Sequence, residues 1–244
     1  HAMVKLSEKD DKLLPFLLKE LSHISPELAG RVTITPKLKG FDAVIATGSN
    51  NTSRYFHYYF GEVSHIIRKN RNAVGVLTGN ESREELHDLA VDIFRYFGLG
   101  CRNVSKLYVP AGYDFMPLME VIEDYRDIIN HKPYENNYLY NKSFMVMNNE
   151  AFMDTGFFMV REAESLASPI GMLHYSYYHS SQALTRELDQ NWEAIQCVVG
   201  APQAHERVEV LPGAAQQPSL WDYPDRVDTM AFLQTLEQKS VKAS

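Results

Sequence analysis

The stretch NAVGVLTGNESREELHDLAVDIFRYFGLGCRNVSKLYVP, residues 72–110, decides the fold class. Its opening NAVGVLTGN predicts a buried strand, because the run is short, apolar and closed by glycine and asparagine. Residues 83–97 predict a helix, since apolar residues recur there at helical spacing and Gly98 ends the pattern. SKLYVP predicts a second buried strand. Strand, helix and strand in this order are typical of α/β layers with parallel strands.

The same alternation continues on both sides of this stretch. FDAVIATGSNNTSRYFHYYF, residues 41–60, predicts a strand, a small polar turn and an aromatic helix, and leucines at helical spacing predict another helix near residues 13–21. The later segments SFMVMNN, GFFMVRE, IGMLHYSYYH and AIQCVVG predict a part richer in strands. LPGAAQQPS, residues 211–219, is typical of an exposed loop. The predicted fold class is therefore α/β with mainly parallel strands.

Composition narrows the class of protein. The chain has 244 residues, 45% hydrophobic content and a formal net charge of -7, which favours a globular protein and argues against non-specific binding to nucleic acid or anionic lipid. No apolar run is long enough to span a bilayer, and no signal peptide precedes the fold. Two cysteines are too few for a disulfide framework and fit a reducing compartment. We therefore expect a cytoplasmic protein without a nucleic-acid partner or a membrane span.

The two cysteines have different surroundings. Cys101 follows a predicted helix and the tripeptide GLG, with Arg102 beside it. Glycines would expose the thiol, and a neighbouring cation would favour the thiolate, so Cys101 is a candidate nucleophile. The alternative is ordinary packing, because free cysteine is among the most buried residue types. Cys197 has apolar neighbours on a predicted strand and is expected in the core.

Other motifs are weaker. The turn TGSNNTS, residues 47–53, joins a strand to a helix and would bind a phosphate through free N–H groups, or would simply cap the helix. It lacks the lysine of a P-loop and the full G-x-G-x-x-G spacing. The chain contains no H-E-x-x-H motif, no zinc spacing of cysteine and histidine, and no G-x-S-x-G. A metal site and a serine hydrolase therefore have no support.

Several ordered segments together resemble one family. FDAVIATGSNNTSRYFHYYF, IIRKNRNAVGVLTGNE, DIFRYFGLGCRNVSKLYVP, ASPIGMLHYSYY and LWDYPDRVDTMAFL are similar to LuxC-type acyl-CoA reductases, a divergent branch of the aldehyde dehydrogenase superfamily. The resemblance implies a partial Rossmann-type cofactor domain over residues 1–75, an α/β catalytic domain over residues 76–215 and a C-terminal segment over residues 216–244. It also implies that the N-terminal part of the family, which precedes VKLS, is lacking.

The resemblance implies a role for Cys101 and for several cofactor contacts. It implies that Cys101 attacks the acyl thioester, and that Gly48 and Ser49, in the TGS turn, pack against a dinucleotide. VKLSEKD is similar to the KPSE segment of aldehyde dehydrogenases, with leucine in place of proline. This similarity implies that Lys5 and Glu8 contact the adenosine ribose of NADPH or NADH.

Two positions depart from the superfamily pattern. Glu164 stands one position out of register for the glutamate that contacts the nicotinamide ribose. IIRKNRN carries no acid where aldehyde dehydrogenases have the general base of an ELGG motif. Because hydrolysis needs that base and thioester reduction does not, the resemblance implies reduction of an acyl-CoA to an aldehyde.

Alternatives remain open at the level of sequence. A non-catalytic α/β fragment would bind an acyl group or a partner, and a cysteine acyltransferase or thioesterase would need a His/Asp motif that is not found. Aromatic and methionine side chains would either line an acyl pocket or pack in the core: Phe157, Phe158, Met159, Tyr175 and Tyr177. An exposed sheet edge would permit a homodimer.

Overall fold

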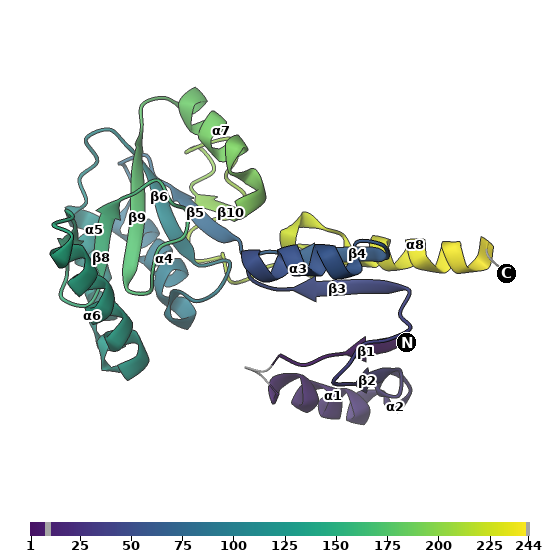
Figure 1. Cartoon of the computed structure of the whole chain (residues 1–244). Helices are drawn as coiled ribbons and strands as arrows, with labels where there is room; N and C mark the ends of the chain where they lie inside the picture. Colours follow the sequence, from purple (N-terminus) through teal and green to yellow (C-terminus); the bar gives the residue numbers. More distant parts are fainter. Residues whose placement is uncertain (8–10, 243–244) are drawn as a thin grey trace.

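A six-stranded sheet forms the core of the larger part of the molecule (Figure 1). The structure is a computed structural model that describes residues 1–7 and 11–242. The strand order is β10-β5-β6-β9-β8-β7, and every neighbouring pair is parallel except β7 and β8. The strands are β5 (Asn72–Val76), β6 (Val104–Pro110), β7 (Met153–Asp154), β8 (Met159–Glu162), β9 (Met172–Tyr178) and β10 (Ile195–Gly200). The predicted α/β class with mainly parallel strands is confirmed.

The β5–α4–β6 unit follows the opening stretch of the sequence. Helix α4 (Arg83–Phe94) begins with a capping box, in which Ser82 and Glu85 satisfy each other's backbone N–H groups. Glutamates in its first turn complement the helix dipole. The crossover places Val76 beside Tyr108 in the parallel register.

Alternation along β6 separates the two faces of the sheet. Leu107 and Val109 pack with Leu89 of α4 and with α5 (Met116–Ile122) in the largest core cluster. Tyr108 points the other way and packs with Leu184 of α7 (Ser181–Gln190). Because successive strand residues face opposite sides, a run of fully buried residues here requires helices on both faces.

A smaller part lies beside the large sheet. It contains two parallel two-stranded sheets, β1 (Ala2–Val4) with β2 (Val32–Ile34) and β3 (Ala43–Thr47) with β4 (Ser64–Arg68). Its helices are α1 (Leu13–Ile24), α2 (Pro26–Ala29) and α3 (Asn50–Phe60). The chain returns here at its C-terminus, where α8 (Thr229–Lys242) lies beside β4 and the guanidinium of Arg68 donates to the Thr229 hydroxyl at 3.0 Å (Figure 1).

Two predicted elements differ from the structure. The helix predicted over residues 83–97 ends at Phe94, because Tyr96 and Phe97 have the left-handed φ values 56° and 60° within a short 3₁₀ turn, Arg95–Gly98. SFMVMNN, predicted as a strand, is mostly the last part of helix α6 (Lys132–Met147). A proline in its first turn starts α6, and its buried face, Tyr134, Tyr138 and Met145, repeats at helical spacing.

Candidate functional site

Cys101 lies in the turn that enters β6 from its N-terminal end. Its side chain is exposed, whereas Cys197 on β10 is buried in the core, with 2% of its surface exposed. Burial raises the pKa of the Cys197 thiol to about 12. The structure therefore separates the two thiols as the sequence predicts: one is accessible to solvent and the other fills core space.

Asn103 fixes the shape of the cysteine turn. Its side chain is almost fully buried, and its amide donates to the carbonyls of Asp92 and Arg95, both at 2.8 Å. Its side-chain oxygen accepts the Gly100 N–H at 2.8 Å. Asn103 thus takes up carbonyls that the broken helix leaves without partners, and it holds the residues on both sides of Cys101.

A buried carboxylate ties a distant loop to the same turn. Asp92 on α4 has no exposed surface, and it accepts hydrogen bonds from the backbone N–H groups of Gly213 at 2.7 Å and Ala215 at 3.1 Å. Burial raises the pKa of Asp92 to about 6, against the opposing effect of these two hydrogen bonds. Asp92 therefore fixes the loop near residue 215 against the end of α4.

The composition of residues 211–219 predicts an exposed loop, but part of this loop is buried in the structure. Ala215 is fully buried, and its carbonyl accepts a hydrogen bond from Arg102 Nε. The Gln216 side-chain amide lies close to the turn, because a Cβ placed on Gly100 would be 3.5 Å from Gln216 Nε2. That nitrogen is buried and has no hydrogen-bond partner. A long-range contact holds this loop in place, and composition contains no sign of it.

Backbone strain precedes the cysteine. Tyr96 and Phe97 are consecutive non-glycine residues in the left-handed region. Such residues cost on the order of 1–3 kcal/mol each and persist where the surroundings hold them. The ring of Phe97 stacks on His131, with centroids 4.2 Å apart. The turn before Cys101 is therefore held in a conformation that the local sequence alone would not favour.

The predicted TGS turn is a helix start. The hydroxyl of Ser49 accepts the Thr52 N–H at 3.3 Å and caps α3. Gly48 has no room for a side chain, because a Cβ there would lie 2.9 Å from Thr52 and 3.0 Å from Phe56. The capping alternative is thus realised, and a dinucleotide contact at Gly48 and Ser49 stays a prediction.

The remaining predicted cofactor residues lie in separate parts of the fold. Lys5 is exposed and follows β1, so it belongs to a different two-stranded sheet from Gly48, which follows β3. Glu8 lies outside the described residues.

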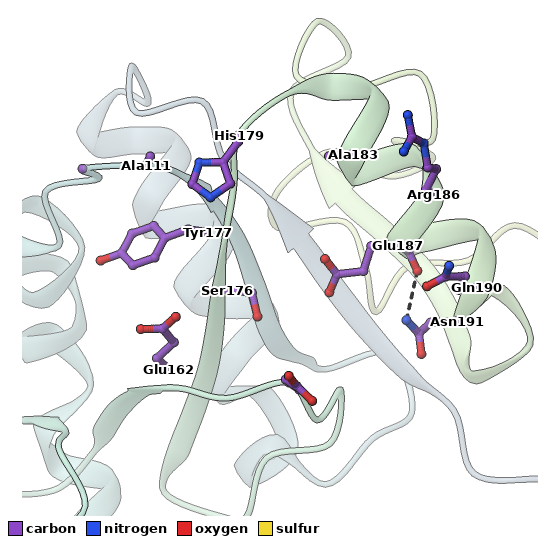
Figure 2. Close-up of a pocket in the computed structure, with 12 residues that line it drawn as sticks. Ala111, Glu162, Ser176, Tyr177, His179, Ala183, Arg186, Glu187, Gln190 and Asn191 are labelled. Atoms are coloured by element: carbon purple, nitrogen blue, oxygen red, sulfur yellow. Dashed lines mark hydrogen bonds between the residues drawn. The ribbon is translucent and has the colours of Figure 1, made fainter.

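Glu164 is among the residues that line a cleft of about 730 Å³ beside α7. The backbone carbonyl of Glu164 accepts a hydrogen bond from the fully buried Lys106 at 2.8 Å. Glu187 of α7 points over Ser176 across the same cleft and lies 3.8 Å from the Lys106 ammonium (Figure 2). Cys101 is not among the residues that line this cleft. The structure therefore does not bring Glu164 and Cys101 together in one pocket, and the nicotinamide-ribose role of Glu164 stays a prediction.

The proposed acyl-pocket residues are largely core. Phe157, Phe158 and Met159 are buried at 0–3% exposure, and Tyr175 packs on Phe115 with ring centroids 4.5 Å apart. Tyr177 lines the Glu164 cleft instead. The packing alternative therefore accounts for the first three of these residues.

Sequence reasoning missed three polar residues at the cysteine turn: Asp92, Asn103 and Gln216. Only Asp92 carried a signal, since it stands three positions after Leu89 on the apolar face of a predicted helix. Within residues 1–7 and 11–242, no group of three or more histidine, cysteine, aspartate or glutamate side chains is placed to hold a metal ion. Among the same residues, no helix is long and apolar enough to cross a membrane.

Comparisons with known proteins identify the fold. No family model and no curated protein sequence matches the chain. Among solved structures, an indole-3-acetaldehyde dehydrogenase mutant from P. syringae, in complex with NAD⁺ and IAA, superposes with a TM-score of 0.64 at 11% identity. The fold resembles part of an aldehyde dehydrogenase. An NAD-dependent aldehyde dehydrogenase from Sinorhizobium meliloti superposes with a TM-score of 0.61 at 12% identity. A proline utilization A protein does so with a TM-score of 0.63 at 13% identity.

The match extends over most of this chain and part of the others. It covers 86% of this chain in all three cases, and 54%, 52% and 27% of the P. syringae, S. meliloti and proline utilization A chains. The chain therefore corresponds to about a quarter to a half of the length of these aldehyde-dehydrogenase-like neighbours.

Proposed function

We propose that Cys101 forms an acyl-enzyme with an acyl-CoA thioester, and that the acyl group is then reduced to the aldehyde with NADPH or NADH. The observation that carries this proposal is the exposed thiol in a rigidly held turn of an aldehyde-dehydrogenase-like fold. The resemblance of the surrounding segments to LuxC-type acyl-CoA reductases supports the thioester as substrate.

The proposed reaction begins with attack on the thioester. The sulfur of Cys101 forms a bond to the carbonyl carbon, and the carbon–sulfur bond to CoA breaks as CoA leaves as its thiol. A nicotinamide cofactor, when bound, would supply the hydride that reduces the acyl group, and the solvent would supply the proton that completes the thiohemiacetal. Collapse of the resulting thiohemiacetal releases the aldehyde and restores the Cys101 thiol.

The absence of a general base from IIRKNRN is consistent with reduction of the acyl-enzyme rather than its hydrolysis. The segment IIRKNRN, residues 66–72, runs from the end of β4 to the first residue of β5, and it contributes cations and amides rather than a carboxylate. Arg68 donates to Thr229 at 3.0 Å, and Arg71 lies 3.3 Å from Asp225, so both guanidiniums are engaged in holding the chain together. An acyl-enzyme is expected to persist when no base activates water beside it.

The residues present fit part of a dinucleotide site. Strand β3 passes through Gly48 into the N-terminus of α3, and glycine at this position lets Thr52 and Phe56 pack closely against the turn. Backbone N–H groups at a helix start favour a phosphate or another electron-rich group. We therefore propose Gly48 and Ser49 as cofactor contacts, with Lys5, Glu8 and Glu164 as further proposed contacts.

Intact-protein mass spectrometry with octanoyl-CoA tests the first step. We expect a gain of one octanoyl group in the wild type and in Cys197→Ala, the variant at the buried thiol, but not in Cys101→Ala. A gain that survives Cys101→Ala would contradict the proposal. Addition of NADPH or NADH to the acylated protein should remove the acyl group as octanal, which gas chromatography detects.

The second candidate is a non-catalytic α/β module. The position of Cys101 favours it, because this thiol is not among the residues that line the cleft at Glu164. An inert Cys101 towards acyl-CoA, in a chain with native circular dichroism, would support the module. Release of octanoic acid without cofactor would instead indicate a thioesterase.

A further inference from the structure

We propose that Gln216 is a catalytic residue, whose side-chain amide donates a hydrogen bond to the thioester carbonyl oxygen as Cys101 attacks. This inference rests on the proposed function of Cys101 and assigns a donor to the same site. It starts from an unsatisfied group: Gln216 Nε2 is buried and has no hydrogen-bond partner. A buried amide without an acceptor is unfavourable, so the position is explained if an acceptor arrives with the substrate.

The location of this amide connects it to the cysteine. Gln216 Nε2 lies 3.5 Å from the place that a Cβ on Gly100 would occupy, and Gly100 directly precedes Cys101. The absence of a side chain at Gly100 lets the amide approach the backbone of the turn closely. A Cβ at Gly100 would also lie 2.8 Å from the Asn103 side-chain oxygen, so glycine is the residue that this geometry accepts.

The amide is held there by contacts of the residues that directly precede Gln216. Asp92 accepts the N–H groups of Gly213 and Ala215, and Arg102 donates to the Ala215 carbonyl. Asp92 belongs to α4, and Arg102 is the residue that directly follows Cys101. Gln216 is therefore carried by a loop that is fixed to the cysteine turn itself, which is the preorganisation that an oxyanion donor requires.

The chemistry needs such a donor. When the Cys101 sulfur bonds to the carbonyl carbon, the electron pair of the C=O bond moves to oxygen and forms a negatively charged tetrahedral centre. An N–H aimed at that oxygen stabilises the charge. The electron pair then returns to re-form C=O and the bond to the CoA sulfur breaks. The leaving thiolate takes a proton from water, which balances the proton that the Cys101 thiol gives up to water when it attacks. Gln216 gains and loses no proton in these steps.

Neighbouring glutamines provide a matched pair for the test. Gln216→Ala and Gln216→Glu remove the amide donor, the second without changing the size of the side chain. Gln217→Ala and Gln217→Glu are the controls, because Gln217 is exposed and donates at 3.3 Å to the Gly213 carbonyl. Each full-length variant is reacted with octanoyl-CoA and, separately, with iodoacetamide. Iodoacetamide alkylates the thiol by displacement at carbon and creates no oxyanion.

We expect both Gln216 variants to acylate about 100-fold more slowly than the wild type, the usual effect of losing one oxyanion donor. Alkylation of Cys101 should stay within about twofold of the wild type, as should both reactions of the Gln217 variants. Wild-type acylation rates in the Gln216 variants would overturn the inference while leaving the proposed function intact. Equal loss of acylation and alkylation would overturn it in favour of a structural role. A wild type that is alkylated but never acylated would overturn the proposed function itself, and with it the donor role.

Discussion

The carboxylate of Asp92 accepts a hydrogen bond from the backbone N–H of Gly213 at 2.7 Å, although 121 positions separate the two residues in the sequence. This contact holds the loop at residues 211–219 against helix α4, close to the turn that contains Cys101. It also sets an expectation for how stability depends on pH.

We expect the free energy of unfolding to fall as the pH rises and the buried Asp92 carboxyl loses its proton. Burial raises its pKa from 3.8 to about 6, with nearby Asp88 acting in the same direction and Arg95 against it. The folded state therefore binds the proton more tightly than the unfolded state, and the contribution of Asp92 falls between about pH 4 and pH 6. The measurement is urea unfolding of the wild type and Asp92→Asn at pH 4.5 and pH 7. The free energy of unfolding of the wild type, relative to that of Asp92→Asn, should be smaller at pH 7 than at pH 4.5. A difference that stays the same or grows in favour of the wild type at pH 7 would contradict the assignment.

Lys106 should matter more than an exposed lysine. Its ammonium is fully buried and donates to the carbonyls of Ala163 and Glu164. Lys106→Met removes the ammonium donor from both carbonyls, although the Ala163 carbonyl still accepts from the Ser176 hydroxyl at 3.2 Å. We therefore expect a loss of at least about 2 kcal/mol in the free energy of unfolding. Lys132→Met is the control, because the Lys132 side chain is 79% exposed and its ammonium pairs with Glu135 at the surface. Its loss should stay below about 0.5 kcal/mol. Urea titrations measure both losses. Equal losses in Lys106→Met and Lys132→Met would show that the hydrogen bonds of the buried ammonium contribute little to stability.

Burial also lowers the pKa of Lys106, with Glu187 and Glu164 opposing the effect. A lowered lysine pKa means that the unfolded state binds the proton more tightly. The contribution of Lys106 to stability should therefore increase as pH rises towards 10.5. A comparison of wild type and Lys106→Met at pH 7 and pH 10 measures this change, and a stability difference that shrinks at pH 10 has the wrong sign.

Gly48 is expected to tolerate no side chain. The Cβ of Gly48→Ala would lie 2.9 Å from Thr52 and 3.0 Å from Phe56, which forces α3 to shift. We expect destabilisation of about 1–3 kcal/mol, the usual cost of overpacking. Gly30→Ala is the control, because its Cβ would meet nothing closer than 3.4 Å and its φ is -64°. Thermal unfolding by circular dichroism compares the two, and equal melting temperatures would refute the steric argument.

The two thiols should react at different stages of unfolding. An aromatic disulfide reagent should titrate Cys101 in the native protein, since that thiol is exposed. Cys197 is 2% exposed, and burial raises its pKa to about 12, so it should react only after denaturation. The colorimetric count is expected to be one thiol without urea and two with it. Two reactive thiols in the native protein would mean that β10 opens readily.

The sequence determined the layers of this protein because its signals are local. Apolar runs at 72–80 and 105–110, with helical spacing between them, predict β5, α4 and β6, which the structure contains. Neighbouring residues are enough to show that a strand is buried or that a helix has one apolar face. The same local reading distinguished Cys101, flanked by glycine, from Cys197, surrounded by apolar residues.

Local patterns failed where a longer element or a tertiary contact decided the outcome. SFMVMNN looks like a strand on its own but belongs to a helix that starts at Lys132. The predicted helix 83–97 ends early because Tyr96 and Phe97 adopt the left-handed conformation, and Asn103 takes up the freed carbonyls. Composition alone predicted an exposed loop at residues 211–219.

The sequence by itself thus determined the α/β class, the parallel sheet and the candidate nucleophile Cys101. Only the tertiary structure decided what surrounds that thiol: Asp92 and Arg102 fix the loop of Gln216, whose unpaired amide lies beside Gly100. The physical reason is the range of the interactions. Periodic burial is set by residues a few positions apart, whereas these hydrogen bonds join residues 113 to 123 positions apart and form only when the chain has folded.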